Sequence, residues 1–233
     1  MKIIVLSLNN EIGKKRRDLI NYEYEWFKGN DKLENVPEEF IKKMNKMYNI
    51  SDNLFKAKVC HFYGYYQILK KIVSEEIDNV IICEDDAILK DTSSIIDPFN
   101  TNEILLMNSH LHHPNSWKKD TKKYHHDNIL PLINNFKEGI VAYINYRTLL
   151  NEIDYNKFKW SCCACIYYPT HQKCLELINE IDNSKKITTF DLWVSKKKII
   201  KNLIYPSVFK IQDNGVSQIH KAAGLIDNYK TIK

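Results

Sequence analysis

The strongest constraint on the fold is a long amphipathic helix that leads directly into a short apolar strand. Over residues 53–76 apolar side chains recur at gaps of three and four, which places them on one face of a helix. These residues are Phe55, Val59, Phe62, Tyr66, Leu69 and Val73. The chain then turns into residues 80–83, a run of Val, Ile, Ile and Cys that is too short and too apolar for anything but a buried strand. A helix followed by a buried strand predicts an α/β domain.

The rest of the chain repeats this alternation, so we expect one α/β domain over residues 1–233 with a largely parallel central sheet. Candidate strands span residues 2–8, 22–27, 79–83, 103–108, 139–144, 162–168 and 204–211. A second helix is predicted to follow Thr170 as its N-cap, because Pro169 ends the strand before it. We expect that helix to bury Cys174, Leu177, Ile178 and Ile181.

Residues 109–137 interrupt the pattern with five histidines, two prolines and several lysines, and they show little periodicity. This composition predicts a long mobile loop, of the kind that often serves as a lid or contacts an acceptor. The loop divides the domain into a part of about residues 1–108 and a part of residues 138–233.

The charge balance excludes few functions. The net charge of +5 comes from 34 basic and 29 acidic residues spread along the chain, which is compatible with an anionic ligand such as a nucleotide diphosphate. We expect no nucleic-acid partner, because the aromatic and basic motif of a known module is lacking. No run approaches the roughly 20 apolar residues of a membrane span.

The six cysteines lie inside apolar runs, and residues 162–165 lack the two-residue gap of a zinc knuckle. The apolar start at residues 1–8 reads as a first strand, because no small-residue cleavage site follows it. We therefore expect a soluble, cytoplasmic protein with reduced cysteines in its core.

Three consecutive acids, Glu84, Asp85 and Asp86, follow the apolar strand directly. Like charges at the edge of a core repel one another and resist desolvation, so a function must compensate for them. Ligands of open α/β sheets bind at the carboxyl ends of strands, and Mg²⁺ or Mn²⁺ prefers carboxylate and phosphate oxygens. Alternation along the strand would put Glu84 and Asp86 on one side and Asp85 on the other. We assign Asp86 to the metal, with Glu84 helping through the metal or a ribose; a solvated turn is the alternative.

Several further segments combine with this triplet into a recognisable pattern. They are Val5-Leu6-Ser7-Leu8 with Arg16-Arg17, Cys60 through Ile72, Ile81 through Leu89, Glu103 through Asn108, Phe190-Asp191, Tyr205-Pro206, Gln212 and Ser217. The chain resembles glycosyltransferase family 25, the group of lipooligosaccharide and collagen galactosyltransferases. Only the acidic triplet and its spacing are specific, and the family's serine-histidine pair falls here on Tyr63-Gly64.

The resemblance implies a GT-A-like nucleotide-sugar-binding fold, a UDP-hexose donor, a glycan or protein acceptor, a divalent metal and inversion at the anomeric carbon. It implies that residues 1–108 bind the donor and residues 138–233 lie on the acceptor side. The expected donor-binding residues are Ser7, Leu8, Asn9, Arg16, Arg17, Glu84 and Asp85.

Two residues of the C-terminal part complete the expected site. Asp191 matches the family's late aspartate and is the candidate general base, although Thr188 and Asp191 also fit the start of a helix. His220 is a candidate third metal ligand beside Asp86 and Glu84, and a surface or core histidine is the alternative. Two rival functions stay open, namely an inactive nucleotide-sugar-binding module and a metal-dependent nucleotidyltransferase.

Overall fold

A mixed β-sheet forms the centre of the fold. The computed structural model describes residues 1–44, 52–90, 101–107, 127, 131, 139–142, 165–190, 193–194, 199–200, 202–205 and 208–211. The strands are β1 (Lys2–Ser7), β2 (Glu25–Lys28), β3 (Val80–Glu84), β5 (Leu105–Leu106), β6 (Gly139–Ala142), β7 (Cys165–Tyr168) and β8 (Asn202–Tyr205). Within the described residues their order across the sheet is β2-β1-β3-β7-β5-β8-β6.

The strand directions confirm the α/β class and show two reversed strands in the sheet. β1 runs parallel to β2 and β3, and β5 runs parallel to β8. β7 runs antiparallel to both β3 and β5, and β6 runs antiparallel to β8. The sheet is therefore mixed: β1, β2, β3, β5 and β8 share one direction, in line with the largely parallel sheet that we expected, and β7 and β6 run the opposite way. A strand buried on both faces has the same apolar sequence in either direction, so the pattern does not reveal this reversal.

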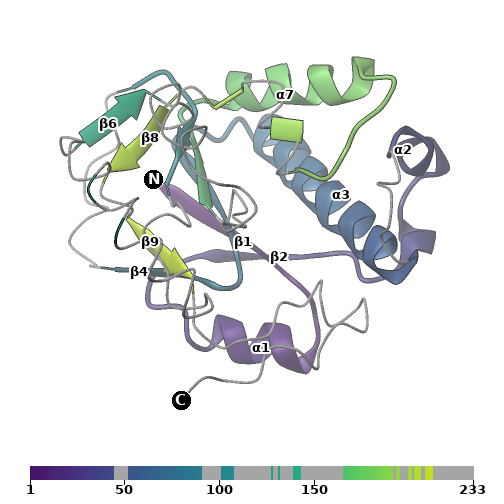
Figure 1. The fold of residues 1–233 in the computed structure, drawn as a ribbon, viewed down its shortest axis with the longest axis horizontal. Coiled ribbons are helices and arrows are strands. Elements are labelled where there is room, and N and C mark those ends of the chain that lie inside the picture. Colours follow the sequence, from purple (N-terminus) through teal and green to yellow (C-terminus); the bar gives the residue numbers. More distant parts are fainter. Residues whose placement is uncertain are drawn as a thin grey trace.

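Both faces of the sheet are covered, and the alternating side chains divide into two cores. The covering elements are α3 (Asp52–Ser74), α7 (His171–Asn183), β4 (Ala87–Leu89) and β9 (Phe209–Ile211). Ile4 and Ile82 belong to the core under α3 and α7, whereas Val5 and Ile81 belong to the core shared with β4 and β9. Figure 1 shows α3 and α7 beside each other and the β4–β9 pair in another part of the fold.

Both long helices agree with the sequence predictions. Of the six residues expected on the inner face of α3, four are buried, and Phe55 and Val73 are partly buried against the same core. α7 begins directly after Thr170, whose hydroxyl accepts a hydrogen bond from the backbone N–H of Lys173. It buries the four expected residues. The 3.6-residue period was thus sufficient to place both helices.

The short strands agree less well. The expected strand over residues 204–211 consists of β8 and β9, which belong to different sheets. β4 follows the acidic triplet and pairs antiparallel with β9. This strand was not predicted, because three residues are too few to show a period. The expected strand 22–27 corresponds to the four residues of β2, and the expected strand 103–108 corresponds to the two residues of β5. The predicted strand 79–83 corresponds closely to β3, 2–8 to β1 and 139–144 to β6.

Part of the sequence predictions lies outside the described residues. These are the loop 109–137, apart from residues 127 and 131, and the first three positions of the expected strand 162–168. Cys60, Cys83, Cys165 and Cys174 are buried, as expected for cysteines of the core, whereas Cys162 and Cys163 lie outside the described part. Among the described helices, none is long and apolar enough to cross a membrane.

Three short helices border the N-terminal half of the sheet, and one of them positions the functional site. They are α1 (Glu11–Arg17), the 3₁₀ helix η1 (Leu33–Asn35) and α2 (Glu38–Lys43). Asn10 is the N-cap of α1, and its side chain accepts a hydrogen bond of 2.8 Å from the backbone N–H of Gly13. A Cβ atom on Gly13 would lie 2.2 Å from the backbone oxygen of Leu8 and 2.8 Å from Ser7 Oγ. α1 is therefore packed directly on the end of β1.

We expect Gly13→Ala to lower the free energy of unfolding by about 2 kcal/mol, because the added methyl group collides with backbone. In an unobstructed helix the same change stabilises by about 1 kcal/mol, so the sign of the effect is diagnostic. Urea denaturation measures it. Gly29→Ala is the matched control, since its nearest neighbours would be side-chain carbons of Leu6 and Leu8 at 3.3 Å. A Gly13→Ala protein as stable as the parent would contradict the close packing.

Candidate functional site

A cavity of about 560 Å³ opens at the carboxyl ends of β1 and β3, where α1 and α3 approach the sheet. This is the edge of an open α/β sheet at which ligands commonly bind. Its lining includes Ser7, Leu8, Arg16, His61, Glu84, Asp85 and Asp86. The cavity thus brings together the three consecutive acids and three of the residues expected near the first strand.

Asp85 is held inside the protein by two side chains. Its Oδ1 atom accepts a hydrogen bond of 2.8 Å from Arg16 Nη1, and its Oδ2 atom accepts one of 2.7 Å from Ser7 Oγ. Only 5% of Asp85 and 6% of Arg16 are exposed, so the pair is shielded from water. Asp85 therefore links the end of β3 to β1 and to α1, and its visible contacts are structural.

Arg17 also contacts the end of β1, and it contacts β2 through Trp26. Its Nη1 atom donates to Ser7 Oγ at 2.6 Å and to the backbone oxygen of Leu8 at 2.8 Å. The guanidinium carbon lies 4.0 Å from the ring centre of Trp26, and the indole N–H donates to the backbone oxygen of Ser7. Both arginines that we expected near a diphosphate are thus engaged with groups of the protein.

Glu84 lies on the opposite side of the strand and contacts α3. Its Oε1 atom is 3.3 Å from Nε2 of His61. The His61 ring packs edge-on against Tyr65 with centroids 5.1 Å apart, and Tyr65 stacks on Phe190 at 4.1 Å. The contacts of Glu84 and Asp85 agree with the expectation that these two acids face opposite sides.

His61 is a residue of the site that the sequence reasoning missed. It lies one turn before Gly64 on α3, and both residues face the end of β1 and β3. A Cβ atom on Gly64 would lie 2.9 Å from Leu6, so the helix approaches the sheet closely there. The available signal was a histidine one turn before a buried glycine on the same helix. The sequence pattern of this segment indicated only the apolar face of the helix, which does not include His61.

Asp86 has the least satisfied carboxylate of the three. Its Oδ2 atom is 3.5 Å from Arg16 Nη1, whereas its Oδ1 atom is buried without a hydrogen-bond partner among the described residues. Burial and the negative charge of Glu84 raise the pKa of Asp86 to about 7. A buried carboxylate oxygen that lacks a donor suits a cation or a donor group brought by a ligand.

The position of Asp86 corrects the expectation that it shares a side with Glu84. Glu84 contacts α3, but Asp86 contacts Arg16 of α1. The reason is that β3 ends at Glu84 and residues 85–86 form a turn into β4, so the alternation of the strand stops there. Both side chains still line the same cavity.

The other expected site residues fall into two groups. Asn9 and Arg17 are described but are not part of the cavity lining. Asp191 and His220, the candidate base and the third candidate metal ligand, lie outside the described residues. Over the described part of the chain, no group of three or more His, Cys, Asp and Glu side chains is arranged to hold a metal ion.

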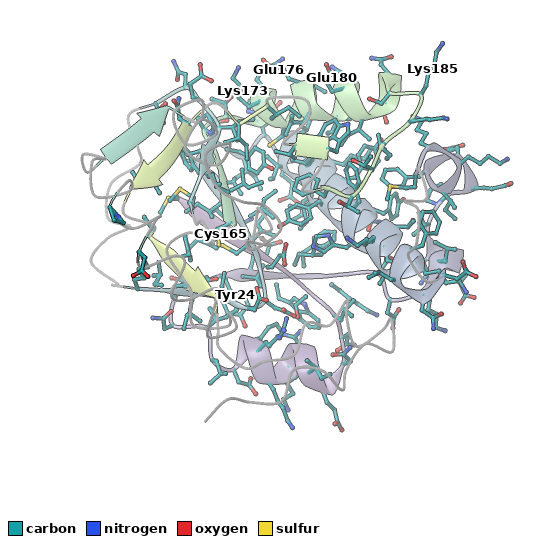
Figure 2. The ribbon with its side chains drawn as sticks, in the orientation of Figure 1. Tyr24, Cys165, Lys173, Glu176, Glu180 and Lys185 are labelled. Carbon is teal, nitrogen blue, oxygen red and sulfur yellow. The ribbon has the colours of Figure 1, made fainter. Side chains whose placement is uncertain are left out.

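A second depression, of about 450 Å³, lies at the C-terminal end of α7 and differs in kind. Its lining is exposed and polar, and Figure 2 shows Glu176, Glu180 and Lys185 along the outer side of this helix and the segment after it. It contains no buried charge, whereas the cavity beside the acidic triplet contains a buried ion pair. The cavity at the triplet is therefore the candidate site.

No protein-family model and no curated protein matches the chain. The functional argument therefore depends on the cavity and on the residues that line it.

We expect Asp85→Ala to lower the free energy of unfolding by about 3 kcal/mol, because it removes the carboxylate that lies 2.8 Å from the buried guanidinium of Arg16. Urea denaturation at neutral pH measures the loss. Asp18→Ala, which removes an exposed carboxylate at the end of α1, is the control and should change stability by less than about 0.5 kcal/mol. The double variant Asp85→Ala/Arg16→Met should recover part of the loss. Equal stability of Asp85→Ala and the parent would contradict the anchoring role.

We expect Asp86→Asn to stabilise the protein near pH 8 and to have little effect near pH 4. The pKa of Asp86 rises on folding from 3.8 to about 7, so the folded protein keeps a proton in this window that the unfolded chain releases. The stability due to the protonated group is complete below pH 3.8 and is lost as the pH rises through about 7. The neutral amide avoids that loss, which is on the order of 4 kcal/mol.

Urea denaturation of the parent and Asp86→Asn at both pH values tests this sign. Asp18→Asn, the same substitution at an exposed position, serves as the control. A stabilisation that is equal at both pH values would show that the pKa of Asp86 is not raised.

Proposed function

We propose that this chain is a metal-dependent glycosyltransferase that moves a hexose from a UDP-sugar to a hydroxyl of a glycan or protein, on a GT-A-like fold. One observation carries the proposal: in a cavity at the carboxyl ends of two parallel strands, a buried carboxylate oxygen of Asp86 has no hydrogen-bond partner within the described part of the chain. The resemblance of the acidic triplet to family 25 supports the reaction class. The volume of about 560 Å³ is in the range of small-molecule sites.

The acids of the cavity fit a hard divalent cation. Asp86 offers an oxygen to which no described residue donates a hydrogen bond, and Glu84 offers a second carboxylate at the same cavity. These two residues would hold Mn²⁺ or Mg²⁺, with His220 as the proposed third ligand. The ion would supply positive charge where negative charge develops on the leaving diphosphate.

The remaining residues of the cavity set the geometry. Asp85 fixes the turn after β3 through Arg16 and Ser7, and Arg16 also lies beside the carboxylate of Asp86. The acid of the proposed cation site is therefore oriented by a buried network rather than by solvent. On the other side, Nε2 of His61 lies 3.3 Å from Oε1 of Glu84, and both residues line the cavity.

Inverting transfer also needs a base that accepts the proton of the attacking hydroxyl. Asp191 is proposed for this role from its place in the sequence. The residue before it, Phe190, is 1% exposed and stacks on Tyr65, which itself contacts His61 of the cavity. These aromatic contacts connect Phe190 to a residue that lines the cavity.

A second candidate function is a nucleotide-sugar-binding module without turnover. The observation that favours it is the engagement of Arg16 and Arg17 with Asp85, Ser7 and Leu8, because these contacts compete with a diphosphate for the guanidinium groups. Such a module would bind a UDP-sugar with its cation and leave the glycosidic bond intact.

We expect the protein to release UDP slowly from one member of a UDP-sugar panel when Mn²⁺ is present. Asp86→Asn should reduce this release at least about 100-fold, because it removes a cation ligand and its charge. The same variant is expected to be at least as stable as the parent, so unfolding does not account for the loss. Asp18→Asn is the matched control and should keep the parent rate.

The two candidate functions give different results in this assay. Release of UDP that requires Mn²⁺ and Asp86 supports the transferase. Binding of a UDP-sugar in the presence of Mn²⁺ without release from any donor supports the module. If neither release nor binding occurs with any UDP-sugar, both candidates are wrong.

A further inference from the structure

His61 of α3 is packed against buried aromatic rings. Its ring lies edge-on to Tyr65, with centroids 5.1 Å apart, and Tyr65 stacks on Phe190 at 4.1 Å with nearly parallel planes. Tyr65 and Phe190 are almost completely buried. The side chain of His61 is 19% exposed and lines the cavity beside the acidic triplet. The imidazole therefore lies between packed rings and the cavity, which limits the orientations that it can adopt.

The close approach of α3 to the sheet brings this ring to Glu84. Gly64 lies one turn after His61, and a Cβ atom on Gly64 would lie 2.9 Å from Leu6 of β1. Glu84 is the last residue of β3, and it lies opposite Leu6 in the register of the two strands. At this separation of helix and sheet, Nε2 of His61 is 3.3 Å from Oε1 of Glu84. The contact thus joins α3 to the end of β3.

The two acids of the proposed cation site are contacted from different helices. Asp86 lies 3.5 Å from Nη1 of Arg16 on α1, whereas Glu84 lies beside His61 on α3. The side chain of Glu84 is 27% exposed and has several rotatable bonds, so holding it in one rotamer costs conformational entropy. Side chains that contact a metal-binding carboxylate keep it oriented, and their loss typically weakens metal binding about 10- to 100-fold. His61 is placed to act on Glu84 in this way.

We propose that His61 is a positioning residue that holds the carboxylate of Glu84 in the orientation that binds the divalent cation. This role rests on the proposed function, because it concerns the cation site of that function. Within the described residues, no group of three or more His, Cys, Asp and Glu side chains is arranged to hold a metal ion. We therefore assign His61 to Glu84 rather than to the cation itself.

The test measures the dissociation constant of Mn²⁺, with UDP present, for the native full-length protein and for three substitutions of His61. The electron paramagnetic resonance signal of free Mn²⁺ reports binding and does not require turnover. His61→Gln keeps a nitrogen near the position of Nε2 and should bind Mn²⁺ within about threefold of the parent. His61→Asn, whose amide reaches only the position of Nδ1, and His61→Leu should each weaken binding about 10-fold or more.

His171→Leu is the matched control. It removes a histidine whose Nδ1 atom lies 2.8 Å from Oδ1 of Asp78, which is a contact of the same kind outside the cavity lining. The Mn²⁺ affinity of this variant should equal that of the parent. The urea midpoint of each variant separates an effect on the cation from an effect on folding. Because Gln and Asn carry the same amide group, the difference between these two variants reports the place of the nitrogen rather than the loss of the ring.

The outcomes separate this role from the proposed function. Weaker Mn²⁺ binding by His61→Asn and His61→Leu, with recovery in His61→Gln, supports the positioning role. If Asp86→Asn abolishes Mn²⁺ binding but His61→Asn and His61→Leu bind as tightly as the parent, the positioning role is wrong and the proposed function stands. Equal weakening in all three variants also contradicts the role, because Nε2 would then have no part in it. If the parent binds no Mn²⁺ with or without UDP, the proposed cation site is wrong, and the role of His61 is wrong with it.

Discussion

The buried ion pair between Asp85 and Arg16 is the interaction on which the candidate site depends. One carboxylate joins the end of β3 to α1 through Arg16 and to β1 through the hydroxyl of Ser7. The elements that form one wall of the cavity are thereby fixed to one another. A buried pair of this kind contributes little net stability, because desolvation offsets much of the attraction. Its main effect here is geometric: it determines where the turn of residues 85–86 lies and where Asp86 is presented.

The three consecutive acids present an electrostatic problem that the structure solves by giving each a different neighbour. Asp85 is neutralised by Arg16, Glu84 lies beside His61 on α3, and Asp86 shares Arg16 at the longer distance of 3.5 Å. The charge that remains least compensated is that of Asp86, and the raised pKa of this residue follows from that. The triplet is therefore one anchor and two cavity-lining acids rather than three equivalent ligands.

Local sequence patterns predicted the elements that are long enough to show a period, α3 and α7, and the apolar strand β3. They also indicated the acidic triplet and its position at the end of a strand. The direction of β7 and the pairing of β4 with β9 were not predictable, because each depends on a contact between distant segments. The separate roles of Asp85 and Asp86 depend on the residue at which β3 ends, and a shift of one residue would exchange their neighbours. His61 becomes recognisable only when the rotation of α3 against β1 is known.

The position of β7 has a consequence for synthesis of the chain. β3 lies between β1 and β7, but β7 begins about 80 residues later in the sequence. Until β7 has been translated, the edge of β3 that pairs with β7 lacks this partner. Unpaired apolar edges are sites at which nascent chains associate with one another, and flanking charges oppose that association. Glu84, Asp85 and Asp86 follow the apolar part of this strand directly, so they are flanking charges of this kind.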